Sequence, residues 1–417
     1  MKILHLLHSF PPESNGGTET YVAQLARAQL ESGDRALVVS GSQREGAQPI
    51  REPGRPEVLR LPHPPPEAVD LSGRSRGARE HLAAIAREER PDVLHLHHWH
   101  QLTTDAVACF AAAGVPTVVS LHDFYLHCPL FFCLPDDRHL CPPDVDRGTC
   151  ARCVAPLRGE TAEVLERAFG PREERFRAEL ETAAAVLALS AAQVEYLRAV
   201  PWLEGIEIQL LPLPVPAVPG ARGQPVPRPP RPRRRPDQPL RLVSWGGLIP
   251  GKGLGTLVEA CATSAHADRF RIEHHGRILQ PEFARELQRR AGRTPLHLHG
   301  SYRAEELAGL VEDADLAVFP SLYLETHGFT VDEALVLGLP VLVADRGAPP
   351  SRVGSRGLVF PAGDARALRE ILEGFLAEPS RLDDLRRGAH GLHVAMDAHR
   401  RELAALYARA VAPRGAG

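Results

Sequence analysis

The sequence contains almost no lysine. Of its 49 basic residues only Lys2 and Lys252 are lysines, and the others are arginines. A net charge of -3 excludes a general attraction to nucleic acid or anionic lipid, so such a partner would need a local patch. No apolar run approaches the roughly 20 residues of a membrane span, and the amino-terminal stretch is too short and too polar for a signal peptide. We therefore expect a cytoplasmic protein that does not bind nucleic acid.

Two nucleotide-binding motifs and internal repeats are also missing. No GxGxxG follows the first expected strand, where Asn15-Gly16-Gly17 stands instead, and this argues against a Rossmann dehydrogenase. The glycine-rich turn around Lys252 lacks the Ser or Thr that follows the lysine of a Walker loop. No repeat with a period of about 20 to 50 residues is evident.

Length and pattern predict two α/β domains. A chain of 417 residues exceeds what one hydrophobic core usually serves. Short apolar runs alternate with helical patterns in both halves, as in doubly wound parallel sheets. We expect an amino-terminal domain over 1–211 with a cysteine-rich insertion at 124–157, a linker over 212–239, a second domain over 240–390, and a final helix within 391–417 that crosses back to the first domain.

The linker is rich in proline and arginine, most of all from Arg228 to Pro236. Proline removes backbone donors, so this stretch is expected to be extended. Its arginines are either solvated or in contact with acidic lipid headgroups. The second interpretation would place the protein peripherally at the inner face of a membrane.

Two carboxylates, Glu325 and Glu333, follow an apolar run that predicts a buried strand, Leu316–Phe319. Glu325 is expected on the loop after this strand and Glu333 one turn into the helix Phe329–Leu337. Ligands of open parallel sheets bind beyond the carboxyl ends of the strands. Carboxylates repel phosphates but accept hydrogen bonds from hydroxyls, so a sugar and a ribose are the predicted partners. The alternative is a pair of ordinary surface carboxylates.

Lys252 lies in the glycine-rich turn Trp245–Gly255, between an expected strand and an expected helix. Glycines let the backbone approach a phosphate closely, and a compact ammonium group can neutralise a diphosphate. The alternative is a turn lysine in solvent. Asp313-Ala-Asp315 resembles a metal-binding DxD, but it precedes its strand and therefore lies at the edge away from ligands. We interpret it as structural.

Histidines gather at the ends of two expected strands of the first half. His122 directly follows the strand Pro116–Leu121. From the residues alone it is either a hydrogen-bonded core histidine or a site residue. A denser run lies on and after the expected strand Val93–Leu96, and its alternation suggests pairs on opposite faces, with metal binding as one interpretation. This run comprises His95, His97, His98 and His100.

Five of the seven cysteines lie between Cys128 and Cys153. Cys150-Ala-Arg-Cys153 is a CxxC that can chelate one ion, and two further thiolates would complete a tetrahedral zinc site. A reducing cytoplasm disfavours a disulfide. Structural zinc, a disulfide and unlinked thiols all stay open. The preferred zinc ligands are Cys128, Cys141, Cys150 and Cys153, with Cys133 or His139 as substitutes.

Together these residues resemble the retaining glycosyltransferases of family 4. The resemblance covers nearly the whole chain, and its motifs are Asn15-Gly16-Gly17, Ser120-Leu121-His122-Asp123, Gly251-Lys252-Gly253, Glu325 with Glu333, and Gly338-Leu339-Pro340-Val341. It implies a GT-B fold, in which two Rossmann-like doubly wound domains face a central cleft. It also implies a UDP-, GDP- or ADP-sugar donor on the second domain, a saccharide or lipid-linked saccharide acceptor on the first, and no catalytic metal.

The resemblance also implies residue roles. His122 would help position the sugar, and Asp123 would orient His122. Glu325 would bind donor sugar hydroxyls, and retention would need no enzyme nucleophile. The implied donor-binding residues are Gly246, Gly247, Lys252, Gly276, Gly328, Phe329, Thr330 and Glu333, and Gly16 and Gly17 would lie on the acceptor side.

One position departs from the family pattern. An Arg usually precedes the Leu of the glycine-rich turn, whereas this chain has Gly247 before Leu248. Arg277 is the candidate to supply the missing charge. The departure keeps a non-catalytic GT-B protein that binds sugar nucleotide or saccharide as the alternative function, with a GT-B epimerase as a third.

Overall fold

The structure is a computed structural model that describes residues 1–44, 50–52, 54–64, 73–135, 139–218, 238–388 and 393–412. The chain forms two compact units. The first comprises Met1–Cys133, Cys141–Pro214 and Val394–Gly417, and the second comprises Leu134–Leu140 and Val215–His393. The arginine cluster of the expected linker, 228–236, lies outside the described residues.

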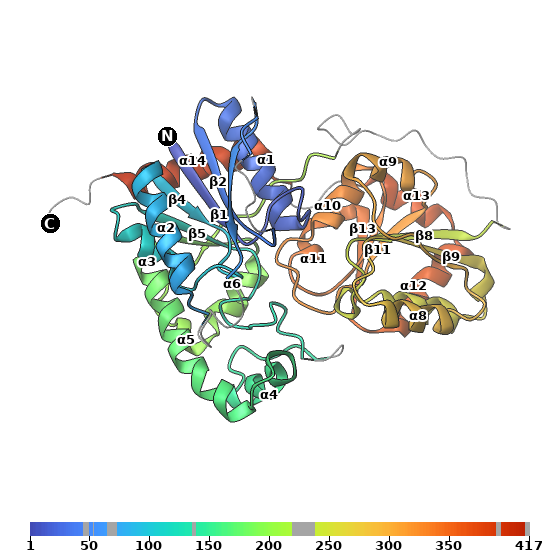
Figure 1. The fold of residues 1–417 in the computed structure, drawn as a ribbon. Helices are drawn as coiled ribbons and strands as arrows, with labels where there is room; N and C mark the ends of the chain where they lie inside the picture. Colours follow the sequence, from blue (N-terminus) through green and yellow to red (C-terminus); the bar gives the residue numbers. More distant parts are fainter. Residues whose placement is uncertain are drawn as a thin grey trace. The chain divides into compact units, whose positions relative to one another are not determined.

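A seven-stranded parallel sheet forms the centre of the first unit, in the order β3-β2-β1-β4-β5-β6-β7 (Figure 1). Its inner strands are apolar along nearly their whole length because helices cover both faces. The order reverses between β1 and β4, which is where ligands of such sheets usually bind. The strands are β1 (Lys2–Leu7), β2 (Arg35–Ser42), β3 (Glu57–Pro62), β4 (Val93–Leu96), β5 (Thr117–Leu121), β6 (Ala185–Ala188) and β7 (Gln209–Leu210).

The helices of this unit come from both ends of the chain. The last helix packs beside the first and against β4 and β5 (Figure 1). On the cysteine-containing side, α4 packs along α5, and the side chains of Asp146 and Thr161 cap their amino termini. The helices are α1 (Gly17–Glu31), α2 (Arg76–Glu89), α3 (Ala106–Ala111), α4 (Arg147–Arg158), α5 (Ala162–Thr182), α6 (Ala191–Arg198) and α14 (Met396–Val411).

The second unit has a six-stranded parallel sheet in the order β10-β9-β8-β11-β12-β13. The strands are β8 (Leu240–Trp245), β9 (Phe270–His275), β10 (Leu296–Leu298), β11 (Leu316–Phe319), β12 (Val341–Ala344) and β13 (Gly357–Phe360). The helices are α7 (Leu254–Ala262), α8 (Pro281–Arg290), α9 (Leu307–Leu310), α10 (Phe329–Val336), α11 (Pro349–Arg352), α12 (Ala365–Ala377) and α13 (Ser380–Arg387).

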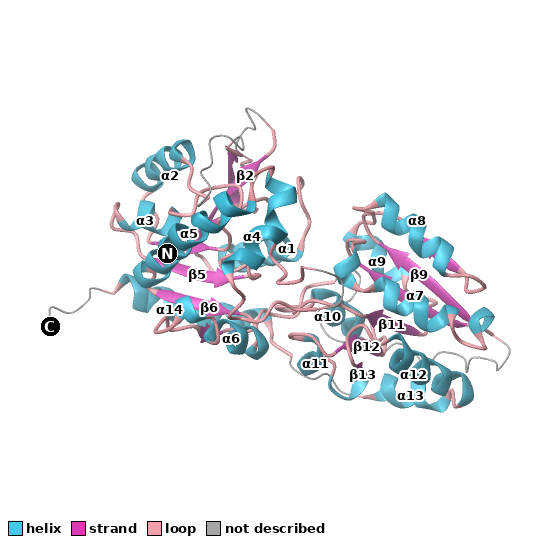
Figure 2. Cartoon of the chain, turned by 90° about the horizontal axis from the view of Figure 1, so that it is seen from below, coloured by secondary structure: helices cyan, strands magenta, loops and turns pink. Residues whose placement is uncertain are grey.

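Successive strand residues of this sheet enter two different cores. Leu242 and Val318 join the core formed with α7, α8 and α12, whereas Val243 and Ala317 join the core formed with α9 and α10. Helices accordingly lie on both sides of the strands (Figure 2). The α/β fold of two doubly wound parallel sheets, predicted from the sequence, is confirmed.

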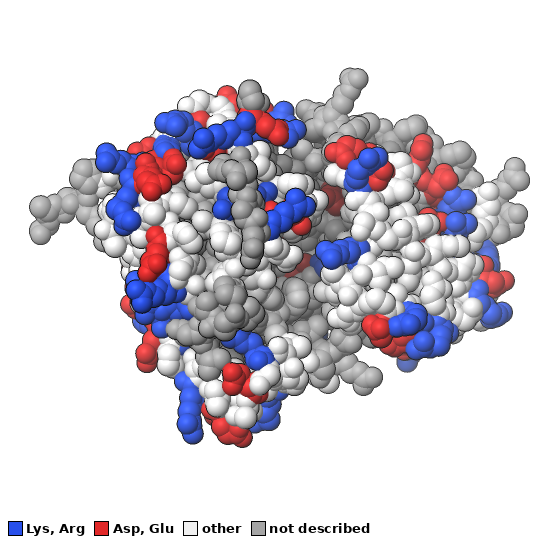
Figure 3. Space-filling model, in the orientation of Figure 1, with Lys and Arg blue, Asp and Glu red and all other residues white. Residues whose placement is uncertain are grey.

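None of the described helices is both long and apolar enough to cross a bilayer. On the face shown in Figure 3, acidic and basic side chains are interspersed over both units. This mixture is what the small net charge predicts.

Candidate functional site

Lys252 and Glu325 form an ion pair in the second unit. Lys252 Nζ lies 2.7 Å from Glu325 Oε1, and the Ser321 hydroxyl donates to the same oxygen at 2.7 Å. Lys252 follows β8 and Glu325 follows β11, which are neighbours in the sheet. Two residues 73 positions apart therefore meet beyond the carboxyl ends of adjacent strands, where the sequence predicted a ligand site.

The ion pair keeps both groups charged. Burial disfavours the charged form of each, but Glu325 raises the pKa of Lys252 above its usual range. Against the same effect of burial, Lys252 and Ser321 hold the pKa of Glu325 below its usual value. The ring of Tyr323 lies 5.1 Å from the ammonium, close enough for a cation–π contact. The side chains of Lys252 and Glu325 are 31% and 14% exposed, so a ligand can reach both.

Glu333 lies on α10 and is held by Trp245, the last residue of β8. The indole Nε1 donates to Glu333 Oε2 at 2.7 Å. Burial raises the pKa of Glu333 to about 7; Asp332 adds to this shift, and the Trp245 hydrogen bond opposes it. The carboxylate is therefore poised to gain or lose a proton near neutral pH, and it stays able to accept a hydroxyl hydrogen bond.

Helix α10 begins at the predicted phosphate-binding position. Gly328 precedes it with φ +84°, a left-handed conformation that suits glycine, and Phe329 and Thr330 form its first turn. The first backbone N–H groups of a helix have no partner within the helix and attract anions. Together with Lys252 and Glu325, Thr330 lines a small cavity of the second unit.

Gly246 and Gly276 allow two backbone segments to approach one another. A Cβ atom on Gly276 would lie 1.7 Å from the carbonyl oxygen of Gly246. Gly247 follows, and the next residue, Leu248, donates its backbone N–H to the carbonyl of Arg277 at 2.9 Å. The exposed Arg277 is thus adjacent to the turn that lacks the family's arginine.

Asp313 and Asp315 lie at the opposite edge of the same sheet, directly before β11. The backbone N–H of Arg241 donates to Asp315 Oδ2 at 3.0 Å, and the Arg241 guanidinium lies 2.9 Å from Asp313 Oδ2. Both carboxylates therefore bind Arg241 near the start of β8, as expected of structural residues.

In the first unit, His122 and Asp123 directly follow β5. Asp123 Oδ2 accepts from His98 Nε2 at 2.8 Å, while its other oxygen accepts from the backbone of Tyr125 at 2.8 Å. Burial alone would raise the pKa of Asp123, but His98 and the Tyr125 N–H lower it below its usual value. His122 Nε2 instead lies 3.0 Å from His97 Nδ1. The hydrogen bonds thus link Asp123 to His98, and His122 to His97.

Gly16 and Gly17 stand at the start of α1, on the same unit. Gly16 has extended backbone, and a Cβ atom there would lie 2.5 Å from Glu19 Oε2. The buried Glu19 accepts from the Ser14 hydroxyl at 2.7 Å and lies 3.4 Å from His8 Nε2. Sequence reasoning missed Glu19, although an acid in the first turn of a helix is a recognisable signal.

The cysteine segment is described except for residues 136–138. Cys150 and Cys153 lie one turn apart on α4, and Cys128 interacts with Cys133. The Cys133 thiol lowers the pKa of Cys128 to about 7, against the effect of burial. Among the described residues, the predicted ligands Cys128, Cys141, Cys150 and Cys153 do not form a group whose atoms all lie within 4.8 Å of one another.

Two other groups of potential metal ligands meet that distance. Glu273, His275 and His299 lie on β9 and after β10, but the two imidazoles are stacked at 4.4 Å and 8°, so their lone pairs do not converge. The other group, His5, His95 and His97, is fully buried.

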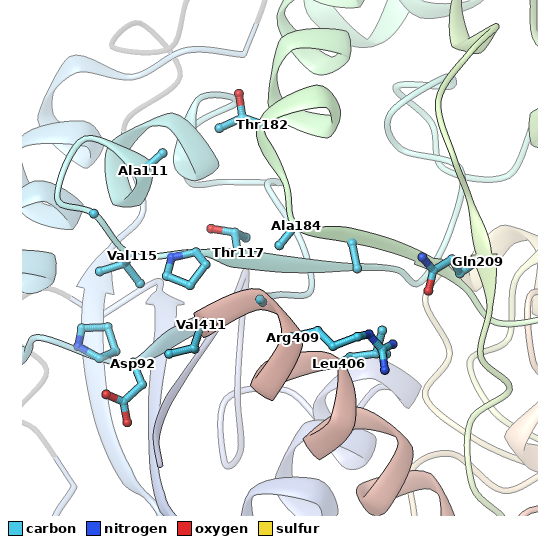
Figure 4. A pocket seen from close by; sticks show the side chains of 15 residues that line it. Asp92, Ala111, Val115, Thr117, Thr182, Ala184, Gln209, Leu406, Arg409 and Val411 are labelled. Atoms are coloured by element: carbon cyan, nitrogen blue, oxygen red, sulfur yellow. The ribbon is translucent and has the colours of Figure 1, made fainter. Parts of the chain in front are cut away.

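A cavity of about 720 Å³ in the first unit lies at the edge of the sheet opposite His122. It is lined by residues at the amino ends of the strands, among them Asp92, Thr117 and Ala184, together with Arg409 of α14 (Figure 4). His122 follows the carboxyl end of β5. We therefore do not assign substrate binding to this cavity.

Two parallel doubly wound units, with a lysine and two carboxylates at the carboxyl edge of one of them, define the class of GT-B nucleotide-sugar-dependent glycosyltransferases. Family models agree: residues 15–217 match Glycosyltransferase Family 4, and residues 239–378 match Glycosyl transferases group 1. The chain belongs to the family 4 glycosyltransferases.

Individual relatives are consistent with this assignment. D-inositol 3-phosphate glycosyltransferase 1 of Catenulispora acidiphila is 27% identical over 390 residues, which cover 90% of this chain and 85% of the relative. A putative colanic acid biosynthesis glycosyltransferase of Escherichia coli, WcaL, is 29% identical over 162 residues, or 35% and 38% of the two chains.

Solved structures show the same fold. Anabaena HepE in complex with UDP and glucose superimposes with a TM-score of 0.65 at 17% identity, covering 98% of this chain and 99% of HepE. Sucrose-phosphate synthase from Thermosynechococcus elongatus gives 0.63 at 20% identity, with 99% and 97% covered.

Proposed function

We propose that this enzyme transfers a sugar, with retention of configuration, from a nucleotide sugar to a saccharide or lipid-linked saccharide. The observation that carries the donor half of this proposal is the cluster of Lys252, Glu325 and Glu333. The lysine can neutralise a diphosphate, and the two carboxylates can accept hydrogen bonds from the hydroxyls of the two sugars that flank it.

Each part of the donor has a proposed partner. The diphosphate takes Lys252 and the first backbone N–H groups of α10, from Phe329 and Thr330. Glu333 accepts from the ribose, and Glu325 accepts from the transferred sugar. Because Lys252 already pairs with Glu325 at 2.7 Å, the diphosphate would share the ammonium with that carboxylate.

The proposed chemistry needs no enzyme nucleophile. The acceptor hydroxyl attacks the anomeric carbon on the face from which the diphosphate leaves, the glycosidic bond to the diphosphate breaks, and the departing phosphate oxygen takes the hydroxyl proton. His122 is proposed to hydrogen-bond the transferred sugar, and Asp123 to hold the neighbouring His98. Support for these roles is the position of His122 beyond the carboxyl end of β5.

The acceptor proposal rests on relatives. WcaL of Escherichia coli and AmsK of Erwinia amylovora are named for colanic acid and amylovoran biosynthesis. A polysaccharide intermediate is therefore the proposed acceptor, and a peripheral position at the inner face of the membrane would give access to a lipid-linked form. As first donor we propose a UDP-sugar, because HepE is described in complex with UDP-glucose.

Donor binding and turnover can be tested together. Purified protein is offered UDP-, GDP- and ADP-sugars, and nucleotide binding and nucleotide release are both measured. Lys252→Ala and Glu333→Ala should each weaken binding of the preferred nucleotide, whereas Lys2→Ala, the other lysine of the chain, should not. Unchanged binding in both site variants would contradict the donor site, and binding without turnover on any acceptor would favour the non-catalytic alternative.

A structural zinc ion is a second proposal, for Cys128, Cys141, Cys150 and Cys153. Its support is the one-turn spacing of Cys150 and Cys153 on α4 and the lowered pKa of Cys128, which favours a thiolate. Coordination would require the four sulfur atoms to move closer together. Metal analysis of protein purified without chelator should find one zinc per chain, and the absence of stoichiometric metal would remove the proposal.

A further inference from the structure

Three buried histidine rings lie next to His122 in the first unit. His5 on β1 and His95 on β4 are register partners in the sheet. His97 follows two residues later, with its ring centroid 4.0 Å from that of His95. All three are at most 1% exposed. A buried polar group without a partner is costly, so these rings must satisfy one another or neighbouring side chains.

The three rings are neutral near physiological pH. Burial lowers the pKa of His5 to about 4, against a smaller opposing effect of its hydrogen bond to Gln29. Burial, followed by repulsion from the neighbouring histidines, holds the pKa values of His95 and His97 well below the usual value. A neutral imidazole has one N–H donor and one nitrogen acceptor, so every hydrogen bond that one ring makes fixes the role of its other nitrogen.

The hydrogen bonds form a chain with one consistent direction. Gln29 Oε1, which can only accept, lies 2.7 Å from His5 Nε2. His5 therefore carries its proton on Nε2, and its Nδ1 accepts from His97 Nε2 at 3.0 Å. His97 Nδ1 must then accept from His122 Nε2, also at 3.0 Å. The proton of the His122 ring is thus assigned to Nε2.

The amide nitrogen of Gln29 has no hydrogen-bond partner among the described residues, so only the contact of its oxygen with His5 sets the orientation of this amide. Burial raises the pKa of Tyr407 on α14. The Tyr407 hydroxyl lies 2.6 Å from His95 Nδ1, and His95 Nε2 lies 2.8 Å from the Ser120 hydroxyl. Both ring nitrogens of His95 are therefore engaged, which argues against a metal ion among these histidines.

We propose that His97 and His5 are positioning residues for His122, and that together with Gln29 they hold its ring in the tautomer with the proton on Nε2 and Nδ1 as the acceptor. This inference rests on the proposed role of His122 at the transferred sugar. A neutral His122 of this tautomer accepts a hydrogen bond from a hydroxyl through Nδ1. The opposite tautomer would present an N–H donor at that atom.

The tautomer can be observed without any substrate. Full-length protein is labelled with 15N-histidine, and His122→Asn identifies the signals of His122. Protonated and unprotonated ring nitrogens have well-separated shifts, so the wild type should show N–H at Nε2 and an unprotonated Nδ1. Gln29→Met, which removes the acceptor at the far end of the chain, should convert the His122 signals to mixed tautomers. A wild-type proton on Nδ1, or His122 signals unaffected by Gln29→Met, would overturn the proposal.

Kinetics test the consequence. Met fills the space of His97 without hydrogen-bonding as an imidazole does, whereas Gln can both donate to His5 and accept from His122. We expect His97→Met to lower kcat about tenfold with little change in the KM for the donor, and His97→Gln to retain activity within about threefold. Thermal unfolding of both variants is measured alongside. Equal kcat losses in the two variants would indicate packing alone and contradict the positioning role.

The outcomes separate this inference from the proposed function. If no donor or acceptor is ever turned over, the function fails, but the 15N spectrum still reports the tautomer of His122. If activity is found and the tautomer is wrong, the function stands and the inference fails.

Discussion

Lys252, which we propose to neutralise the donor diphosphate, already has a carboxylate partner. Glu325 lies 2.7 Å away, and the family's usual arginine is replaced by Gly247. The exposed Arg277 is adjacent to this turn through the Leu248 hydrogen bond to its carbonyl. The proposed donor site therefore has one fixed cation fewer than the family pattern, and donor affinity should respond to a cation placed at position 247.

Gly247→Arg should tighten donor binding. A Cβ atom at this position would meet only the end of the half-exposed Leu279 side chain, at 3.2 Å, and the backbone does not have positive φ. One charge-assisted hydrogen bond is worth about 1.5 kcal/mol, so the KM for the donor should fall about tenfold. The matched control is Gly247→Gln, of similar reach without charge. An equal change in both variants would show that charge is not the missing element.

Glu333 should make donor binding pH-dependent. With a pKa of about 7, roughly a tenth of the molecules carry the charged carboxylate at pH 6 and most do at pH 8. Because the charged form accepts both ribose hydroxyls, the KM for the donor should rise up to about tenfold as the pH falls from 8 to 6. Glu333→Gln should give a flat profile, and a wild-type KM independent of pH would contradict the assignment.

The same carboxyl group has the opposite effect on stability. Its folded pKa exceeds its ordinary value of 4.5, so the unfolded chain releases this proton first as the pH rises. The contribution of Glu333 to the free energy of unfolding is therefore complete below about pH 4.5 and is lost between about pH 4.5 and 7. Donor binding should therefore be strongest in the pH range where protonation of Glu333 no longer stabilises the fold.

At the scale of elements, α10 is fixed by a buried ion pair. Arg352 of α11 donates from Nε to Asp332 Oδ1 at 2.7 Å, and His327 Nε2 lies 3.0 Å from Asp332 Oδ2. Burial alone would raise the pKa of Asp332, but His327 and Arg352 hold it below its usual value. The pair therefore stabilises the fold above the ordinary pKa of an aspartate and is lost as the pH falls through the lowered value.

Asp332→Asn should destabilise the second unit strongly. It leaves the guanidinium of Arg352, which is 1% exposed, without its counter-charge, at a cost of about 3 to 5 kcal/mol. Urea unfolding at pH 7 measures the change. The double variant Asp332→Asn with Arg352→Met should lose less than the single variant, because no unpaired charge stays buried. A single variant as stable as the wild type would show that the pair is dispensable.

The strands that hold the site could be predicted, but the contacts between their ends could not. Apolar runs at Val93–Leu96, Leu316–Phe319 and Val341–Ala344 coincide with β4, β11 and β12. Strand β7 has only two residues and is too short to show such a run, whereas β13 was not predicted although Leu358–Phe360 is a short apolar run.

Side-chain partners depend on which strands are neighbours, and this is not visible in a local pattern. The sequence suggested Asp123 as the partner of His122, whereas the structure pairs Asp123 with His98 and His122 with His97. Likewise Trp245 was visible only as the end of a strand, yet it holds Glu333. Both partners come from a neighbouring element whose register is set by the whole sheet.

At the scale of the whole molecule, the first unit is completed by the end of the chain. Helix α14 supplies Tyr407 to His95 at 2.6 Å and His399 to the Tyr21 hydroxyl at 2.8 Å. The second unit, in contrast, is built from one nearly continuous stretch and has its own two cores. Each unit therefore has the means to unfold as a cooperative body.

Calorimetry should resolve two unfolding transitions, and a nucleoside diphosphate should raise only one of them. A ligand that binds only the native second unit stabilises it by about 2.7 kcal/mol at a hundredfold excess over Kd. Lys252→Ala should abolish the shift, and Tyr407→Phe should lower only the other transition. A single transition that moves as a whole would show that the two units unfold together.

The scarcity of lysine makes the molecule unusually easy to observe at two chosen points. Reductive methylation with 13C-formaldehyde modifies amines, and here these are the terminus, Lys2 and Lys252. Lys2 is paired with Glu89 in one unit, and Lys252 with Glu325 in the other. Each of these two dimethylamine signals would therefore report on a different sheet, so a titration with nucleotide could be followed at the ammonium that we propose to bind phosphate, with a built-in reference in the same spectrum.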